Sequence, residues 1–376
     1  MDFSLNEEQR MLTDMVGRFI EREYGFEDRR KLAESDRGWS TDNWTALADT
    51  GLLALNVPQA YGGLGASPVE TLLIMEAFGR GLLLEPFVPT AVIGAALIEK
   101  LANEGQKSDL LGQLAAGTLR TAFATLEPQG RFDLADVLTS AHRNGDGYRL
   151  NGRKSVVAHG DSADWLIVSA RTSGAQRERF GISLFLVPTS AAGMTIRGFA
   201  GLDGQRVAEI ELQDVQVSAD GLLGPVDQGF EDLEWAVDRG LFALCAEAVG
   251  CMAKLTELTV DYLQTRKQFG KPIGSFQSLQ HRLADMLGYV EQSRSITLYA
   301  ASALDGPTEQ RRKAVSAAKA LIGRAGRFIG QHAVQLHGGM GMTDELAIGW
   351  YFKRLTCIDM TWGDSDHHVE RYSEML

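Results

Sequence analysis

The sequence is poor in cysteine, in net positive charge and in long apolar runs, and each shortage excludes a class of protein. Cys245, Cys251 and Cys357 form neither a CxxC pair nor a metal-type spacing, so we predict free thiols in a reducing compartment. The formal charge of −12 argues against nucleic acid or an anionic membrane as a partner. No apolar run reaches the length of a membrane span, and the acidic opening "MDFSLNEEQRMLTDMV" does not resemble a targeting peptide. We therefore predict a cytoplasmic protein that binds neither nucleic acid nor membrane.

Common phosphate and metal signatures are missing as well. GxGxxG and the P-loop pattern do not occur, which argues against a Rossmann or Walker site. "GGLG" at residues 62–65 lacks the flanking strand and helix of a phosphate cradle and is expected to be a loop. The adjacent His367 and His368 point to different faces of any helix, so no metal site is predicted there.

The hydrophobic pattern divides the chain into three parts. Residues 1–117 show helical spacing, residues 118–225 hold short β-rich segments between turn residues, and residues 226–376 return to longer helical elements. We therefore predict an α+β multidomain fold with an N-terminal α-helical domain, a central antiparallel β-sandwich or barrel, and a C-terminal four-helix bundle.

Local signals place some elements within these parts. Asn151-Gly152 predicts a hairpin turn in the β domain. The three long C-terminal helices are expected at about 241–269, 276–304 and 308–337, and the glycine pair after residue 337 ends the last of them.

Two segments at helix ends combine features that suit a ligand. "QTRKQFGKPIGSFQ" brings Arg266 and Lys267 next to a Phe-Gly pair, with Gln277 after it. This basic group suits a pyrophosphate, although composition alone favours a basic helix end that complements the macrodipole. "QLHGGMGMT" contains more glycine than a helix C-cap requires, and glycine lets a flat ligand or another backbone approach closely.

The stretch "TWGDSDHH" at residues 361–368 has two remaining interpretations. Asp364 is either the N-cap of a helix that begins at "SDHH" or a catalytic carboxylate beside the apolar ring of Trp362. The sequence alone leaves both open.

Four blocks together resemble the acyl-CoA dehydrogenase family: "FATLEPQGRFDLADV", "YRLNGRKSVVAHGDSADWLIVSAR", "RKQFGKPIGSFQSLQHRLADM" and "AVQLHGGMGMT". The likeness extends over essentially the whole chain. It implies FAD, an acyl-CoA substrate and α,β-dehydrogenation, with electrons passed to an electron-transfer flavoprotein. It also implies a homo-oligomer (dimer or tetramer), or a heteromer with a larger homologous subunit, and a dicarboxylyl-CoA substrate.

The same resemblance assigns roles to residues at matching positions. Those on the flavin ring or along the nucleotide are Leu126, Val156, Val157, Ala158, Arg266, Phe269, Gln277, Gln335, Gly339, Ser365 and His367. Those on the substrate are Phe132, Asp238 and Trp362.

The chain departs from the family pattern around the flavin ring. Val156 and Ala158 stand where the family usually has Trp and Thr, Phe132 replaces a small Ser, and Leu241 replaces a common arginine. Each change removes a polar or aromatic contact. These departures favour the alternative of a non-catalytic or half-site subunit.

The usual catalytic base is also absent. The family's two positions for a glutamate correspond to Gly363 and Gly240, and Asp364 is the nearest carboxylate. If the chain is catalytic, the resemblance makes Asp364 the base, with Asp366 and Glu247 as weaker alternatives.

Overall fold

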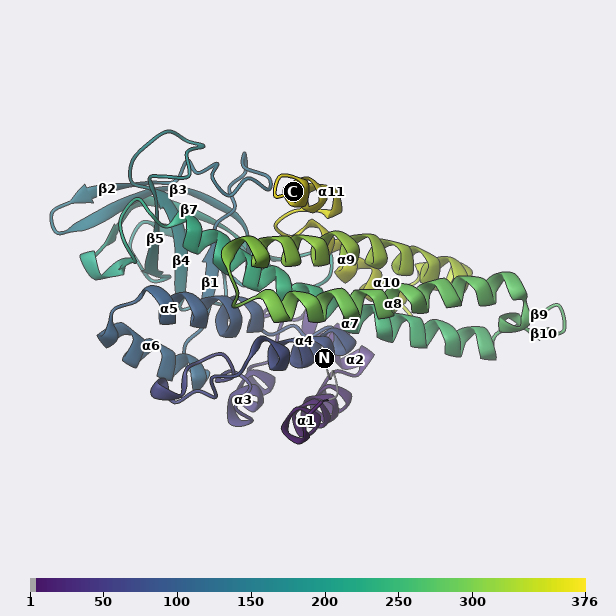
Figure 1. Ribbon diagram of the computed structural model, residues 1–376. Helices are drawn as coiled ribbons and strands as arrows, with labels where there is room; N and C mark the ends of the chain where they lie inside the picture. The colour runs from purple at the N-terminus through teal and green to yellow at the C-terminus, as the bar shows by residue number, and fades with distance from the viewer. Residues whose placement is uncertain (1–4) are drawn as a thin grey trace. The chain divides into compact units, whose positions relative to one another are not determined.

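The computed structural model describes residues 5–376, and the chain divides into two compact units. Of the described residues, the helical unit contains residues 5–31, Pro68–Leu83 and Leu241–Leu376. The sheet unit contains Leu32–Ser67 and Leu84–Gly240. Along the chain the elements run helices, sheet, helices (Figure 1), which confirms the predicted fold class. No helix within residues 5–376 is long and apolar enough to cross a membrane.

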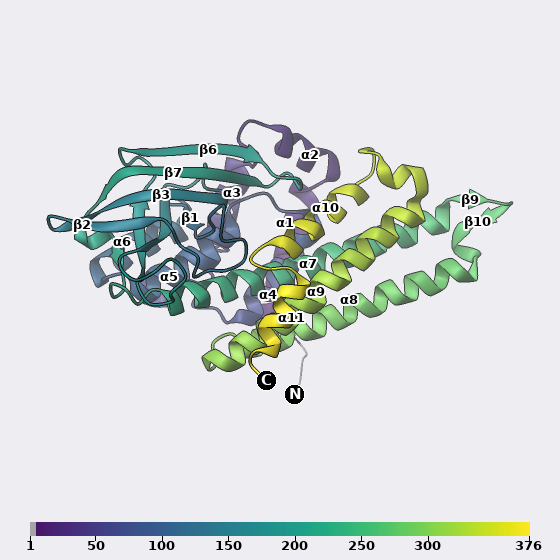
Figure 2. The ribbon, with the colours of Figure 1, turned by 90° about the horizontal axis from the view of Figure 1, so that it is seen from above.

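The helical unit is built mainly from long helices. Its elements are α1 (Glu7–Glu23), the start of α2 (Phe26–Glu34), α4 (Pro68–Gly81), most of α7 (Phe230–Thr265), β9 (Lys267–Gln268), β10 (Lys271–Pro272), α8 (Gln277–Ala303), α9 (Thr308–His337), α10 (Ile348–Met360) and α11 (Ser365–Ser373), with 3₁₀ turns at Ile273–Ser275 and Gly338–Met342. Figure 2 shows α8 and α9 side by side, with the β9–β10 hairpin at the far end of α7 and α8.

Several of these helices begin or pack for identifiable reasons. Pro68 occupies the first position of α4, where its missing N–H costs nothing. α4 crosses α7 at a glycine pair: a Cβ on Gly79 would lie 1.9 Å from the carbonyl oxygen of Glu247, and one on Gly250 would lie 1.8 Å from that of Glu76. Only glycine permits so close an approach.

The sheet unit combines short helices with one sheet. Its elements are the end of α2, α3 (Thr41–Asp49), a 3₁₀ turn at Gln59–Tyr61, a π-helical turn at Val88–Gly94, α5 (Ala95–Leu101), α6 (Glu104–Ala115), β1 (Thr121–Ala124), β2 (Ser140–Asn144), β3 (Gly147–Ala158), β4 (Trp165–Arg171), β5 (Ile182–Pro188), β6 (Met194–Ala200), β7 (Arg206–Val217), a 3₁₀ turn at Ala219–Gly221, β8 (Leu222–Leu223) and the start of α7.

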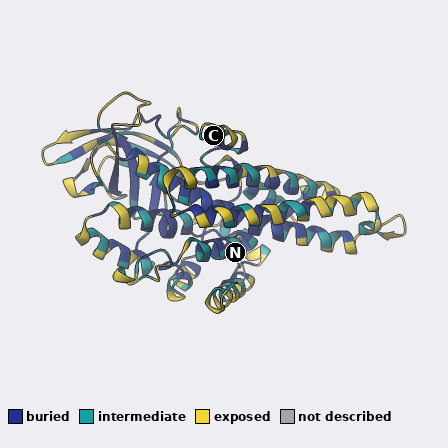
Figure 3. Ribbon diagram, viewed as in Figure 1, coloured by how far each residue is buried: buried dark blue, intermediate teal, exposed yellow. Residues whose placement is uncertain are grey.

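The strands lie in the order β6-β7-β3-β2-β4-β5-β8, and β1 pairs with β4. Most neighbours are antiparallel, whereas β1 runs parallel to β4. Tyr148, Leu150, Val168 and Phe185 belong to the apolar core of the sheet, and Figure 3 shows the central strands buried.

The predicted turn at Asn151-Gly152 is wrong. Both residues lie inside β3, and the β2–β3 hairpin instead turns after Asn144, which pairs with Gly147. Glycine is needed at residue 152 because a Cβ there would lie 2.6 Å from the Cα of Thr139. A close backbone approach was thus misinterpreted as a turn signal.

The long C-terminal helices agree closely with their predicted ranges, with one exception. α9 spans Thr308–His337, as predicted. The helix α7 spans Phe230–Thr265 rather than about 241–269. It begins earlier because Phe230, Leu233 and Val237 already follow helical spacing through the glycine at residue 240.

Candidate active site

The turn at residues 361–364, between α10 and α11, carries Trp362 and Asp364. Two successive residues adopt positive φ, +50° at Trp362 and +114° at Gly363. For a bulky residue such as tryptophan this conformation is uncommon and costs about 1–3 kcal/mol. Surrounding contacts must therefore hold the backbone of this turn in place.

Asp364 forms the N-cap of α11. Its Oδ1 accepts a hydrogen bond from the backbone N–H of His367 at 2.9 Å, which confirms the helix-cap interpretation. Within residues 5–376, Oδ2 has no hydrogen-bond partner, and the residue is only half-buried. Capping and proton abstraction therefore do not compete for the same oxygen atom.

The carbonyl oxygens of this turn accept hydrogen bonds from buried side chains. Lys319 on α9 is fully buried, and its Nζ donates to the carbonyl oxygens of Asp359, at 2.8 Å, and Gly363. Nε2 of His368 lies 3.1 Å from the carbonyl oxygen of Trp362. Burial lowers the pKa of His368 to about 2, so the ring is neutral and Nε2 carries its proton.

Asp359 connects this turn to α9 from a second side. Its Oδ1 accepts hydrogen bonds from the backbone N–H of Ser365 at 3.1 Å and from the Ser365 hydroxyl at 3.0 Å. Its Oδ2 accepts one from Arg327 at 2.8 Å. Gly323 leaves room for this contact, since a Cβ there would lie 2.0 Å from Oδ1 of Asp359. Ser365 is a predicted cofactor residue, but its hydroxyl donates to the Asp359 carboxylate within the protein.

The remaining residues near this turn differ in exposure. His367 is half-buried, and burial lowers its pKa. Asp366 is exposed in the first turn of α11. Both carboxylate oxygens of Glu247 bind Arg354, each at 2.6 Å. This pairing leaves Glu247 poorly suited to act as a base.

A second group of predicted cofactor residues lies around the β9–β10 hairpin. Phe269 is 90% exposed and has a φ of +51°. Arg266 and Gln277, on either side of the hairpin, are exposed as well. An aromatic ring that is so fully exposed is typical of a contact with a ligand or partner.

The end of α9 belongs to the same part of the helical unit. The ring of Tyr262 on α7 stacks on His337 at 4.3 Å and links the ends of α7 and α9. Gln335 and Gly339 are exposed there, and a Cβ on Gly339 would meet no atom within 4 Å. We call Arg266, Phe269, Gln277, Gln335 and Gly339 the tip residues.

The tip residues are distant from the turn at residues 361–364. Lys319, which contacts that turn, and Gln335 are sixteen positions apart on α9. At about 1.5 Å per residue this corresponds to roughly 24 Å along the helix axis. This separation is too large for one small chemical group to contact both sets of residues.

In the sheet unit, the structure brings Leu126 next to a bulge in β3. The backbone N–H of Ser155 donates to the carbonyl oxygen of Leu126 at 2.9 Å. The register of β3 against β7 shifts between Lys154 and Val157, and Val156 is 58% exposed with a φ of +52°. Ala158 is exposed on the same strand. The bulge thus presents a small apolar surface.

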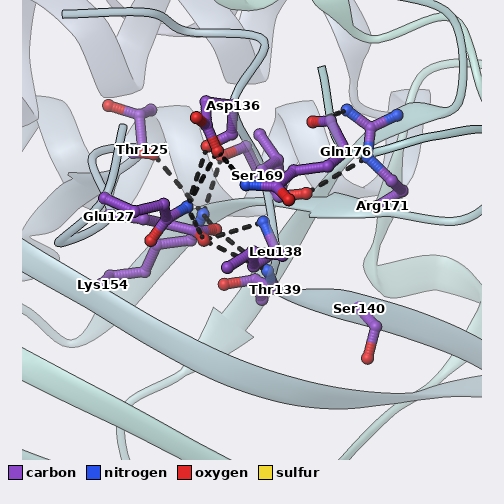
Figure 4. Close-up of polar contacts among 12 residues, drawn as sticks. Thr125, Glu127, Asp136, Leu138, Thr139, Ser140, Lys154, Ser169, Arg171 and Gln176 are labelled. Carbon is purple, nitrogen blue, oxygen red and sulfur yellow. Dashed lines mark hydrogen bonds and ion pairs between the residues drawn. The ribbon is translucent and has the colours of Figure 1, made fainter. Parts of the chain in front are cut away.

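A buried ion pair supports the segment after β1 (Figure 4). Nζ of Lys154 lies 2.7 Å from Oε1 of Glu127, and both side chains are almost fully buried. Glu127 also accepts hydrogen bonds from the backbone N–H groups of Leu138, at 2.8 Å, and Thr139, at 3.1 Å. Burial alone would raise the pKa of Glu127, but the Lys154 ammonium holds it below its ordinary value. The carboxylate is therefore ionised and fixes the loop between β1 and β2.

The other predicted residues of this unit differ in position. The Val157 side chain is 2% exposed and packs in the sheet core, so only its backbone can face a ligand. Phe132 is half-buried, with the Arg131 guanidinium 5.8 Å from its ring centroid. Asp238 is fully buried on α7.

Each unit offers groups that fit a flavin dinucleotide. The exposed apolar side chains of Val156 and Ala158 suit the face of a flat ring. The exposed guanidinium group of Arg266 suits a phosphate, and the open space at Gly339 allows a flat group to approach the backbone.

Sequence reasoning missed the buried groups that support these surfaces: Glu127, Lys154, Lys319 and Asp359. One signal was available, since Lys319 lies inside the apolar helical run "SAAKALIG". A lysine among small apolar residues is unusual unless it is paired.

Three models of the acyl-CoA dehydrogenase family match consecutive segments of the chain. They are the N-terminal domain at residues 6–118, the middle domain at residues 122–215 and the C-terminal domain at residues 227–376.

Individual relatives agree with these matches. The probable acyl-CoA dehydrogenase YngJ of Bacillus subtilis is 30% identical over 371 residues, which cover 97% of each chain. The butyryl-CoA dehydrogenase structure of Megasphaera elsdenii superimposes with a TM-score of 0.91 at 25% identity, over 100% of this chain and 99% of that one. The Tcur3481-Tcur3483 steroid ACAD structure gives a TM-score of 0.89 at 29% identity, over 99% and 98% of the two chains.

Proposed function

Because the chain belongs to the acyl-CoA dehydrogenase family of oxidoreductases, we propose that it catalyses FAD-dependent α,β-dehydrogenation of an acyl-CoA thioester with Asp364 as the base. One observation carries this proposal. Asp364 has one carboxylate oxygen fixed by the start of α11 and the other without a hydrogen-bond partner within residues 5–376, on a turn held by buried side chains.

The roles of the residues follow from these positions. Bound FAD supplies the acceptor for the hydride that leaves the β-carbon. Oδ2 of Asp364 removes the proton from the α-carbon, which the thioester makes acidic. The neighbouring ring of Trp362 limits the access of water to this carboxylate. The N-cap hydrogen bond keeps Asp364 in one orientation.

The proposal also names the second subunit, the substrate class and the electron acceptor. The tip residues lie roughly 24 Å from the turn at residues 361–364 along α9, which supports a cofactor site completed by a second subunit. The resemblance of the chain further suggests a dicarboxylyl-CoA substrate, electron-transfer flavoprotein as the acceptor of electrons, and a cytoplasmic location.

A half-site subunit is the second candidate function. The specific observation in its favour is that glycine occupies both usual base positions, Gly240 and Gly363. The two-protein name of the similar Tcur3481-Tcur3483 steroid ACAD is compatible with such an assembly. In this case the tip residues bind a flavin that a larger homologous subunit completes.

An Asp364→Asn variant tests the role of the base. Asparagine keeps the capping oxygen, so folding and flavin content should stay unchanged. We expect flavin reduction by a saturated acyl-CoA to slow by about 10²–10⁴-fold. The measurement is anaerobic bleaching of flavin absorbance after rapid mixing.

Asp366→Asn is the matched control, because Asp366 is an exposed carboxylate in the same helical turn. The rate of flavin reduction in Asp366→Asn should equal that of the unmodified protein. If Asp364→Asn bleaches as fast as this control, Asp364 is only a helix cap.

A further inference from the structure

The turn at residues 361–364 combines strained backbone with an unusual buried partner. Trp362 and Gly363 both have positive φ, and a conformation of this kind persists only where surrounding contacts over-determine it. Lys319 is fully buried and contacts the carbonyl oxygens of Asp359 and Gly363. None of the steps assigned to Asp364 uses this lysine.

We propose that Lys319 is a positioning residue, whose ammonium group fixes the turn at residues 361–364 so that Asp364 keeps the orientation required of a base. This inference rests on the proposed function of Asp364. It adds a residue on another helix that acts through the backbone and never touches the substrate.

The geometry supports this role in two ways. One Nζ joins both ends of the turn, because Asp359 lies in the last residues of α10 and Gly363 lies directly before Asp364. Lys319 also lies in the interior of α9, a helix of 30 residues, so it offers a rigid anchor. His368 holds the intervening carbonyl oxygen of Trp362. The carbonyl groups thus point inward, and the Trp362 and Asp364 side chains belong to a backbone with little freedom to rotate.

Three amides report the geometry of this turn. The N–H of Ser365 binds the Asp359 carboxylate, that of His367 binds Oδ1 of Asp364, and that of His368 binds the Asp364 carbonyl oxygen. Each hydrogen bond depends on the backbone that Lys319 fixes. Loss of the lysine should therefore expose these three amides first.

The charges around Lys319 are consistent with this role. The groups that face it are Cys245 from α7, Asp359 from α10, Asp364 from the turn, and His367 and His368 from α11. Burial lowers the pKa of Lys319 to about 8, and Cys245, Asp359 and Asp364 oppose that shift. At neutral pH the ammonium group therefore remains charged, and it can hold the carbonyl oxygens of the turn by charge-assisted hydrogen bonds.

Three variants test the proposal. Lys319→Met removes every donor and the charge, and Lys319→Gln removes the charge but keeps an amide donor. Lys313→Met is the control, since Lys313 on the same helix pairs with Glu309 at the surface. The first measurement is hydrogen exchange of the amides of residues 361–368 in substrate-free protein.

We expect Lys319→Met to accelerate exchange at Ser365, His367 and His368 by roughly tenfold or more, with a smaller increase in Lys319→Gln and none in Lys313→Met. If the Met variant does not fold, the Gln variant must still show the local increase. The proposal is overturned if exchange in the turn is unchanged, or if it rises equally along the whole of α9.

The second measurement is flavin reduction by an acyl-CoA. Lys319→Met should lower the limiting rate of flavin reduction by about tenfold or more, and Lys319→Gln should recover part of this rate. The acyl-CoA concentration that gives half of the limiting rate should change little. A merely structural lysine would change the melting temperature without this pattern, and that result contradicts the proposal. If no acyl-CoA reduces the flavin of the unmodified protein, the proposed function fails. Hydrogen exchange still decides in that case whether Lys319 positions the turn.

Discussion

The two units of the molecule each contain a fully buried lysine beside a strained segment, but the lysines have different partners. In the sheet unit, Lys154 pairs with Glu127 below the bulge at Val156. In the helical unit, Lys319 donates to the backbone carbonyl oxygens of Asp359 and Gly363. A carboxylate compensates the charge of the first lysine directly, and backbone dipoles hold the second.

This difference predicts different consequences when each lysine is removed. Without Lys154, the ionised carboxylate of Glu127 would be left in the interior, which is costly for the whole unit. Without Lys319, carbonyl groups lose donors, but the nearby carboxylates keep other partners: Asp359 accepts from Arg327, and Asp364 accepts from the N–H of His367. The first lysine should therefore govern global stability, and the second should govern one turn.

The largest effect is expected for Lys154→Met. Removal of one partner of a buried ion pair typically costs about 3–5 kcal/mol, so urea should unfold this variant at a much lower concentration. Arg149→Met is the control on the same strand, since Arg149 lies in an exposed pair with Asp214. This variant should lower the free energy of unfolding by about 1 kcal/mol or less. Equal losses of unfolding free energy in the two variants would contradict the special role of the Lys154–Glu127 pair.

A pH dependence is expected for Lys319. Its pKa is about 8 in the folded protein and about 10.4 when unfolded. Between these values the unfolded chain binds more protons, so this group favours folding increasingly as pH rises from about 8 to about 10.4. Below pH 8 the full penalty of burying the charge is present.

The measurement is urea unfolding of the unmodified protein and Lys319→Met at pH 7.5 and pH 9.5. We expect the difference in unfolding free energy between them to change by roughly 2 kcal/mol in favour of the unmodified protein at the higher pH. A difference that stays constant would show that Lys319 has an ordinary pKa.

The smallest effect is expected at the strained bulge. Val156→Gly replaces a β-branched residue at a φ of +52° with one that adopts this conformation freely. We expect stabilisation by about 1 kcal/mol. The control Ala158→Gly, at an exposed neighbour on the same strand with ordinary φ, should destabilise by roughly 0.5–1 kcal/mol. If both variants lose stability equally in thermal unfolding, Val156 is not strained.

Local sequence signals predicted the elements well where the causes are local. The helix α9 spans its predicted range, because helical spacing involves neighbours within a few residues. The same reasoning failed at Gly152, since the atom that requires glycine belongs to Thr139 in another segment.

The candidate site was only partly predictable for the same reason. The cap at Asp364 follows from four adjacent residues, and the structure confirms it. The contacts of Lys319 join residues about 40 positions apart, and composition does not reveal which carbonyl oxygens a buried lysine meets. The roles of the tip residues stay predictions, because they rest on the resemblance to the family.

The flavin content and reactivity of the purified chain test the central claim most directly. The protein, expressed without any homologous partner, is examined for flavin absorbance per chain and then mixed anaerobically with saturated acyl-CoAs, including dicarboxylyl ones. We predict about one flavin per chain, bleached by at least one of these substrates. A colourless chain, or a bound flavin that no acyl-CoA reduces, would contradict the assignment of catalysis to this subunit.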